Sequence, residues 1–128
     1  MHHIQDSTEN YLEGIYVLRD QLGHVRSIDL ANYLDISRAS VSAAVKKMEG
    51  EGLVNMAEDG ELKLTIQGAR VGKEIYDRHL TLKKLLMMVG VEETLADHDA
   101  CRMEHAISKE TFHTLKKYLQ DNLPDFQE

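Results

Sequence analysis

Three side chains that commonly bind metal ions occur close together near the end of the chain. Cys101, Glu104 and His105 are spaced i, i+3 and i+4, which would place them on one face of a helix. A thiolate, a carboxylate and an imidazole form a ligand set for a divalent transition metal. Each residue alone also has an ordinary interpretation, because Cys is often a small core residue and Glu and His are common on solvated surfaces. The spacing therefore leaves a metal site and a chance polar cluster equally open.

Two other segments offer further metal donors. His79 lies between Ile75 and Leu82 on an apolar stripe, and a histidine that faces a core needs a partner. That partner is most often a backbone carbonyl or another side chain, with a metal ion as the alternative. Asn10 and Glu13 add oxygen donors at i and i+3, although the same pair would be ordinary on a solvated helix edge. Spacing alone does not bring these segments together.

A third group of residues is suited to DNA. If Ser37 is the N-cap of a helix, the apolar residues Val41, Val45 and Met48 face the core, and small, hydroxyl and lysine side chains lie on the other side. Small residues let a helix enter the major groove, while hydroxyls and lysines bond base edges or phosphates. A merely solvated lysine face is the alternative. The candidate DNA-binding residues are Arg26, Ser37, Arg38, Ala39, Ser40, Ser42, Ala43, Lys46 and Lys47.

Hydrophobic periodicity and turn residues predict the elements that position these groups. We expect a first helix from Asp6 or Ser7 to Gly23, then two short helices separated by residues 35–37. Two strands, residues 53–56 and 62–65, flank Asp59-Gly60, which suits a tight hairpin. A long helix then ends at Gly90, and only helix is evident after it. The order helix, helix, hairpin predicts a winged helix-turn-helix in a mainly α protein.

The composition limits the class of protein. The chain has 128 residues, one Cys and a formal net charge of −7. A single Cys forms no internal disulfide, no segment resembles a signal peptide, and no apolar run approaches the roughly 20 residues that span a bilayer. We therefore expect a soluble cytoplasmic protein with no membrane partner. An acidic protein cannot coat nucleic acid by charge alone, yet residues 26–47 hold four basic side chains against only Asp29 and Asp35.

The segments ENYLEGIY (9–16), YDRH (76–79) and DACRMEH (99–105) closely resemble the diphtheria toxin repressor and manganese transport regulator family. The resemblance covers nearly the whole chain. It implies a winged helix-turn-helix DNA-binding domain with a small β-hairpin wing over residues 1–68. It also implies a linker helix and an all-helical metal-binding and dimerisation domain over residues 69–128. The chain resembles the two-domain members, which lack an SH3-like third domain. The partners implied are double-stranded operator DNA and a second copy of the chain.

The same resemblance assigns the metal ligands Glu13, His79, Cys101, Glu104 and His105, because each matches a ligand type of the family. Asn10 stands where iron-responsive members have Met and manganese-responsive members Asp. Cys101 follows the iron branch, whereas the manganese branch has Glu there. The effector implied is therefore Fe(II) or Mn(II), with Zn(II), Co(II) or Ni(II) also binding in vitro. Lys83 stands where the iron branch has a carboxylate of a second metal site, and His98 is one residue out of register with the histidine of that site. The resemblance therefore does not extend to these two positions, and a second site is not assigned.

The leading hypothesis is a metal-responsive transcriptional regulator, a repressor of metal-uptake genes. One alternative is a winged-helix regulator that responds to a small organic molecule or to oxidation of Cys101. A second is an enzyme with Cys101 as nucleophile and His105 as base, but no oxyanion motif, phosphate loop or triad supports it, and we expect no enzyme activity.

Overall fold

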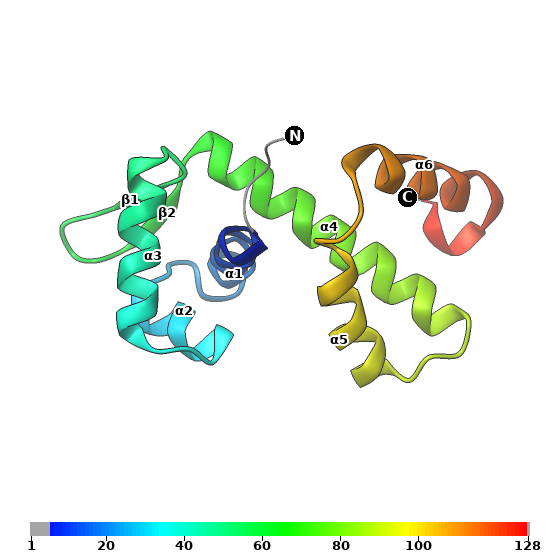
Figure 1. Ribbon diagram of the computed structural model, residues 1–128, viewed down its shortest axis with the longest axis horizontal. Coiled ribbons are helices and arrows are strands. Elements are labelled where there is room, and N and C mark those ends of the chain that lie inside the picture. The colour runs from blue at the N-terminus through cyan, green and yellow to red at the C-terminus, as the bar shows by residue number, and fades with distance from the viewer. Residues whose placement is uncertain (1–5, 128) are drawn as a thin grey trace. The chain divides into compact units, whose positions relative to one another are not determined.

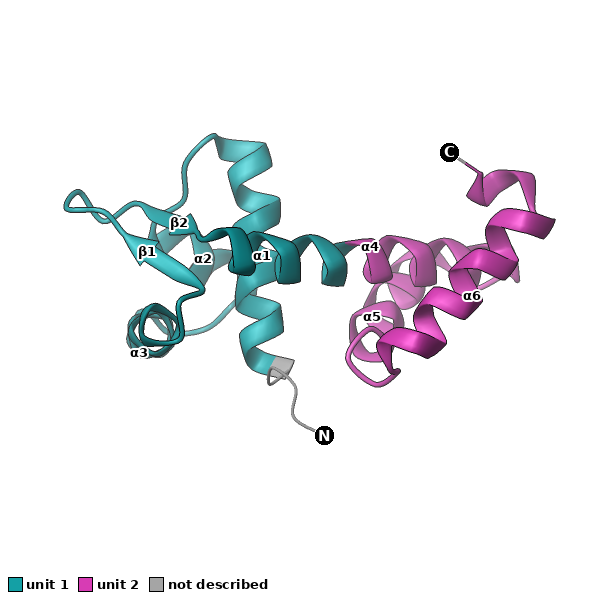
Figure 2. Ribbon diagram, turned by 90° about the horizontal axis from the view of Figure 1, so that it is seen from above, with its two compact units in different colours: residues 1–76 teal, residues 77–128 magenta. Residues whose placement is uncertain are grey.

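The computed structural model describes residues 6–127, and the chain divides into two compact units, Met1–Tyr76 and Asp77–Glu128 (Figure 2). Unit 1 contains α1 (Asp6–Leu22), α2 (Ser27–Leu34), α3 (Arg38–Gly50), β1 (Val54–Met56), β2 (Leu62–Leu64) and the first half of α4 (Ile66–Met88). Unit 2 contains the rest of α4, α5 (Glu93–Met103), α6 (Lys109–Asn122) and a short 3-10 turn, Pro124–Phe126 (Figure 1). None of the described helices is long and apolar enough to cross a membrane.

Unit 1 is a winged helix-turn-helix, as the sequence predicted. Its core combines Leu12 and Ile15 of α1, Leu30 of α2 and Val45 of α3, all at most 1% exposed. Asp35 adopts a left-handed conformation with φ of 55° after α2. The chain can then turn sharply into α3, whose first turn is capped by Ser37.

The wing is the antiparallel pair of β1 and β2, with Val54 opposite Leu64 and Met56 opposite Leu62. Leu62 is buried and Lys63 exposed, the alternation of a strand with one face on the core. Residues 57–61 form the loop between the strands, as the predicted strand bounds imply. The Ala57 carbonyl accepts a hydrogen bond from the Gly60 N–H, and the Glu61 carbonyl accepts one from the Ala57 N–H. Gly60 still takes the positive φ, 88°, that this turn requires.

Helix α4 begins against the backbone of unit 1. The Thr65 side chain caps it by accepting a hydrogen bond from the Gly68 N–H at 3.0 Å. A Cβ atom on Gly68 would overlap the carbonyl oxygen of Leu53, and one on Gly72 would meet the carbonyl oxygen of Leu12 at 2.7 Å. The two glycines therefore let α4 pack directly against neighbouring main chain, which a larger residue would prevent.

In unit 2, α5 ends at Met103. The expectation that Cys101, Glu104 and His105 share one helix is therefore wrong beyond that residue. Glu104 is the C-cap and retains helical angles, whereas His105 lies in the following turn. The buried guanidinium of Arg78 explains the break, since its Nη1 donates to the carbonyls of Glu104 at 3.0 Å and Ile107 at 2.9 Å. Carbonyls satisfied in this way need no helical partner.

Candidate metal centre and DNA-binding face

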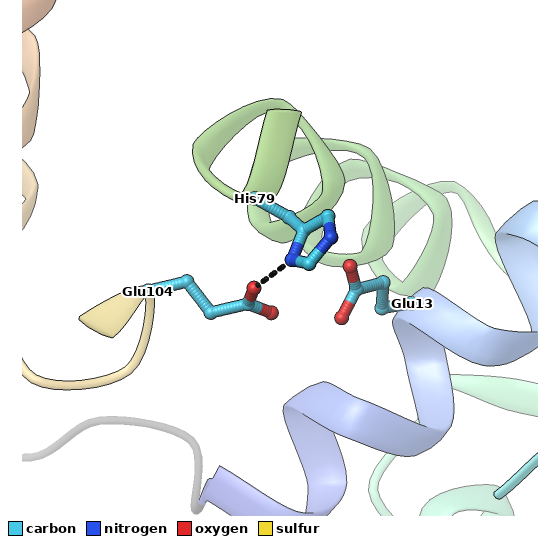
Figure 3. A group of neighbouring side chains, drawn as sticks. All are labelled: Glu13, His79 and Glu104. Atoms are coloured by element: carbon cyan, nitrogen blue, oxygen red, sulfur yellow. Dashed lines mark hydrogen bonds and ion pairs between the residues drawn. The ribbon is translucent and has the colours of Figure 1, made fainter. Parts of the chain in front are cut away.

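The centre of the candidate metal site is a carboxylate and an imidazole in unit 2. His79, on α4, places Nδ1 2.9 Å from Oε1 of Glu104 (Figure 3). The Glu104 side chain is 0% exposed and that of His79 is 14% exposed. A buried carboxylate is costly unless it is paired with a cation or fully hydrogen-bonded. The contact with His79 involves only one of its two oxygens.

The second oxygen of Glu104 has no hydrogen-bond donor within the described part of the chain. Oε2 is buried, and Nε2 of His105 lies 3.6 Å from it, beyond hydrogen-bond distance. The His105 side chain is itself only 7% exposed. A buried carboxylate oxygen with two imidazoles close by is a donor set that suits a divalent transition metal. These residues therefore fit the metal that the sequence predicts.

The other nitrogen of His79 is held by a residue that the sequence analysis missed. Nε2 lies 2.8 Å from Oδ1 of Asp97 on α5. This hydrogen bond holds the pKa of Asp97 below its ordinary value, assisted by the positive charge of Lys83. One signal in the sequence points to this pair, because Glu93 and Asp97 are spaced i, i+4 as His79 and Lys83 are. Only the packing of α5 on α4 shows that the two pairs meet.

The remaining predicted ligands are less closely tied to this pair. Asn10 and Glu13 are half-buried and lie one turn apart on α1 of unit 1. Figure 3 shows the Glu13 side chain on this helix. Cys101 is exposed and lies in the last turn of α5. Within unit 2 the structure thus brings His79, Glu104 and His105 together and leaves the thiol at the surface. His98, considered for a second site, is exposed and lies 3.7 Å from Asp99.

The candidate DNA-binding face follows α3. Ser37 caps the helix by accepting a hydrogen bond from the Ser40 N–H at 3.0 Å. Val41, Val45 and Met48 are buried, as predicted. The opposite face is exposed along the whole helix and consists of Arg38, Ala39, Ser40, Ser42, Ala43, Lys46 and Lys47. This face is thus free of the core and has the chemistry of a surface that enters a DNA groove.

Arg26 lies at the start of α2 and contacts the wing. Its Nε donates to the Asp59 carbonyl and its Nη2 to Asp59 Oδ2, both at 3.3 Å. The Arg26 side chain is 42% exposed, so guanidinium donors remain on the surface. Arg26 therefore joins the wing loop to α2 and still presents positive charge beside it.

Comparison with known proteins places the chain in a family. A model described as "Iron dependent repressor, N-terminal DNA binding domain" matches residues 3–62, and one described as "Iron dependent repressor, metal binding and dimerisation domain" matches residues 65–124. An uncharacterized HTH-type transcriptional regulator from Methanocaldococcus jannaschii is 33% identical over 91% of this chain and 95% of its own length. The chain belongs to the iron-dependent repressor family. This confirms the resemblance to the diphtheria toxin repressor and manganese transport regulator proteins.

Two further similar proteins are named as regulators. Transcriptional regulator MntR of Escherichia coli O6:H1 is 30% identical over 92% of this chain and 76% of its own length. The structure of the manganese regulator SloR matches with a TM-score of 0.78 and 26% identity, over 88% of this chain and 53% of that one. The predicted fold class is confirmed. The chain is a DNA-binding transcriptional regulator of the metal-dependent repressor type, with a DNA-binding and a dimerisation domain.

Proposed function

We propose that this protein represses metal-uptake genes by binding operator DNA as a homodimer when Fe(II) or Mn(II) is bound. The observation that carries the proposal is the buried carboxylate of Glu104, which has an imidazole on one oxygen and no donor from the described residues on the other. Zn(II), Co(II) or Ni(II) would bind the same donors in vitro. A DNA-binding regulator of this kind acts in the cytoplasm and is not an enzyme.

We assign the metal to His79, Glu104 and His105 of unit 2, together with Glu13 of α1. Cys101 and Asn10 are further candidate ligands. They rank below the other four because the thiol is exposed and an amide oxygen is a weaker donor than a carboxylate. A bound divalent cation would supply positive charge beside the buried Glu104 carboxylate and so offset the cost of burying it.

The DNA-binding residues then act through α3 and the wing. We propose that Arg38, Ala39 and Ser40 approach base edges at the N-terminal end of α3, with Ser37, Ser42 and Ala43 lining the same face. Lys46, Lys47 and Arg26 neutralise phosphates. Residues 1–68 form the DNA-binding part and residues 69–128 the metal-binding and dimerisation part. A dimer presents two copies of α3, which suits operator half-sites spaced by whole helical turns.

The test is a DNA-binding titration on genomic operator fragments under reducing, anaerobic conditions with Fe(II), Mn(II), Zn(II) or chelator. We expect tight binding with Fe(II) or Mn(II) and at least about 10-fold weaker binding after chelation, the lower part of the usual range of allosteric coupling. Operator affinity that does not change when metal is removed would contradict the proposal. Loss of DNA binding on peroxide treatment alone would favour the alternative, a regulator switched at the exposed Cys101 thiol.

Glu104→Gln tests the site itself. It keeps the size of the side chain and an oxygen facing His79 but removes the charge. We expect Mn(II) affinity to fall by roughly 100-fold, comparable to the larger effects of altering a metal site, and DNA binding at limiting metal to be lost. Glu110→Gln, an exposed position in the first turn of α6, removes the same charge and should change neither quantity. Equal Mn(II) affinity in the two variants, measured by calorimetry, would place the metal elsewhere.

A further inference from the structure

Two pairs of charged or titratable residues face each other between α4 and α5. His79 and Lys83 are one turn apart on α4, and Glu93 and Asp97 are one turn apart on α5. His79 Nε2 lies 2.8 Å and Lys83 Nζ 3.4 Å from the same oxygen, Oδ1 of Asp97. Lys83 Nζ also lies 3.5 Å from Oε2 of Glu93. The four side chains belong to one unit and form one continuous network.

This network determines which nitrogen of His79 is available. A neutral imidazole carries one proton, so a nitrogen that donates a hydrogen bond cannot also bind a metal. Asp97 accepts at Nε2, and Nδ1 faces the buried carboxylate of Glu104 at 2.9 Å. With the proton on Nε2, Nδ1 carries a lone pair beside the buried Glu104 carboxylate and is available to an ion. The ring is also fixed against rotation, because both nitrogens are held.

Lys83 restrains Asp97. The Asp97 side chain is 54% exposed, and an exposed carboxylate can rotate away to bind water. The Lys83 side chain is 25% exposed, and its ammonium contacts Oδ1 of Asp97, the oxygen that also contacts His79. It therefore favours the rotamer in which Asp97 faces His79. Glu93, whose side chain is 69% exposed, contacts the same ammonium through Oε2.

We propose that Asp97 is a positioning residue for the metal site. By accepting the Nε2 proton of His79 it selects the tautomer whose Nδ1 binds the ion, and Lys83 keeps Asp97 in place. This inference rests on the proposed function, since it assumes that His79 is a ligand. It adds two residues, Asp97 and Lys83, that act on the metal only through His79.

The test combines Mn(II) affinity, measured by calorimetry, with the ring nitrogens of His79, observed by NMR in Zn(II)-loaded, 15N-labelled full-length protein. For Asp97→Ala we expect a roughly 10- to 100-fold loss of Mn(II) affinity, the usual effect of removing the hydrogen-bond partner of a metal-bound histidine. The wild type should show a slowly exchanging proton on Nε2 and none on Nδ1. In Asp97→Ala that proton should exchange quickly with water.

Three further variants separate positioning from charge and folding. Asp97→Glu retains the acceptor and should recover most of the affinity. Asp99→Asn removes the same charge beside His98 and should leave affinity and NMR signature unchanged. Lys83→Met should weaken binding less than Asp97→Ala while speeding exchange of the Nε2 proton.

The two failures are distinguishable. If the wild type binds neither Mn(II) nor Zn(II), the proposed function fails and this inference falls with it. If the wild type binds metal and Asp97→Ala binds equally well, or if the bound form carries its proton on Nδ1, the inference alone is overturned. Equal losses in Asp97→Ala and Asp99→Asn would also overturn it, because they would reduce the effect to general charge.

Discussion

Cys101 is the predicted ligand whose surroundings differ most from those of Glu104. The two residues are only three apart in sequence, yet the thiol is exposed and the carboxylate fully buried. Helix α5 explains the contrast, since its buried face runs through Ala96 and Ala100 and meets Glu104 at the C-cap. A thiol at the rim of the site would contribute to the choice of metal more than to the existence of the site.

Cys101→Ala should therefore separate the metals. A thiolate favours Fe(II) over Mn(II), so we expect Fe(II)-activated DNA binding to weaken by about 10-fold, as for loss of one stabilising contact of 1.4 kcal/mol. Mn(II)-activated binding should weaken less. Anaerobic fluorescence anisotropy with each metal measures both affinities, and Cys101→Ser provides a control of nearly equal size. Equal losses for the two metals would show that the thiol is not a ligand.

The sequence predicted the ligand types of the site but not their surroundings. His79 was expected to face a core and to need a partner, and the structure supplies Glu104 and Asp97. Asp97 was missed because only the packing of α5 on α4 brings it to His79. The end of α5 was also missed, because it depends on Arg78, which binds carbonyls more than 25 residues away. Contacts of this range leave no local pattern in the sequence.

At the level of elements, unit 1 was predictable because local signals agree with one another. Apolar spacing marks α1, α2 and α3, Ser37 supplies a cap, and Gly60 supplies the positive φ of the wing loop. The predicted strands, residues 53–56 and 62–65, leave the loop that the structure has, residues 57–61. The Ala57 N–H donates a hydrogen bond to the Glu61 carbonyl across the base of this loop.

Gly68 gives a test of how α4 packs. Replacing a helical Gly by Ala usually stabilises a protein by about 0.5–1 kcal/mol. Gly68→Ala should instead destabilise the protein by about 1–3 kcal/mol, the usual range for overpacking, because its Cβ would overlap the Leu53 carbonyl. Gly50→Ala, in α3 with open space around it, is the matched control and should show the ordinary gain. Urea unfolding of both variants measures the difference, and a stabilising Gly68→Ala would contradict the close packing.

The wing contact predicts a pH dependence. The Glu61 N–H, and with it the charge of Arg26, holds the pKa of Asp59 below its ordinary value. The ionised carboxylate is thus favoured in the folded state. Its contribution to the free energy of unfolding is present above the unfolded pKa and is lost as pH falls through the folded pKa. Arg26→Gln should raise the pKa of Asp59, as measured by NMR titration. Arg38→Gln removes a similar charge from α3 and should leave it unchanged; the same shift in both variants would argue against a specific contact.

At the scale of the whole molecule, an acidic protein must bind an acidic polymer. The chain carries a net charge of −7, yet Lys46 and Lys47 lie together on the exposed face of α3. Attraction to DNA must therefore come from local basic groups, Lys46 and Lys47 on this face and Arg26 beside the wing, while the net charge of the protein repels the duplex. Repulsion of this kind lowers non-specific binding and leaves more of the affinity to depend on groove contacts.

The salt dependence of operator binding checks this distribution of charge. Each lysine that neutralises a phosphate contributes about one unit to the slope of log affinity against log salt. Lys46→Gln with Lys47→Gln should therefore lower the slope by about two and weaken binding to all DNA sequences alike. Lys109→Gln with Lys117→Gln, both exposed on α6, removes the same charge and should leave the slope nearly unchanged. Equal slopes for the two double variants would assign the phosphate contacts elsewhere.

Arg78 bears on the size of ion that the proposed metal site can accept. Its guanidinium is buried and fixes the main chain at Glu104 and Ile107, on both sides of His105. A larger or smaller ion is therefore accommodated by rotation of the Glu104 and His105 side chains about nearly fixed Cα positions. Sites with stiff backbones rank cations by size as well as by softness. In the proposed metal site, Arg78 would therefore influence which ions fit without touching the ion itself.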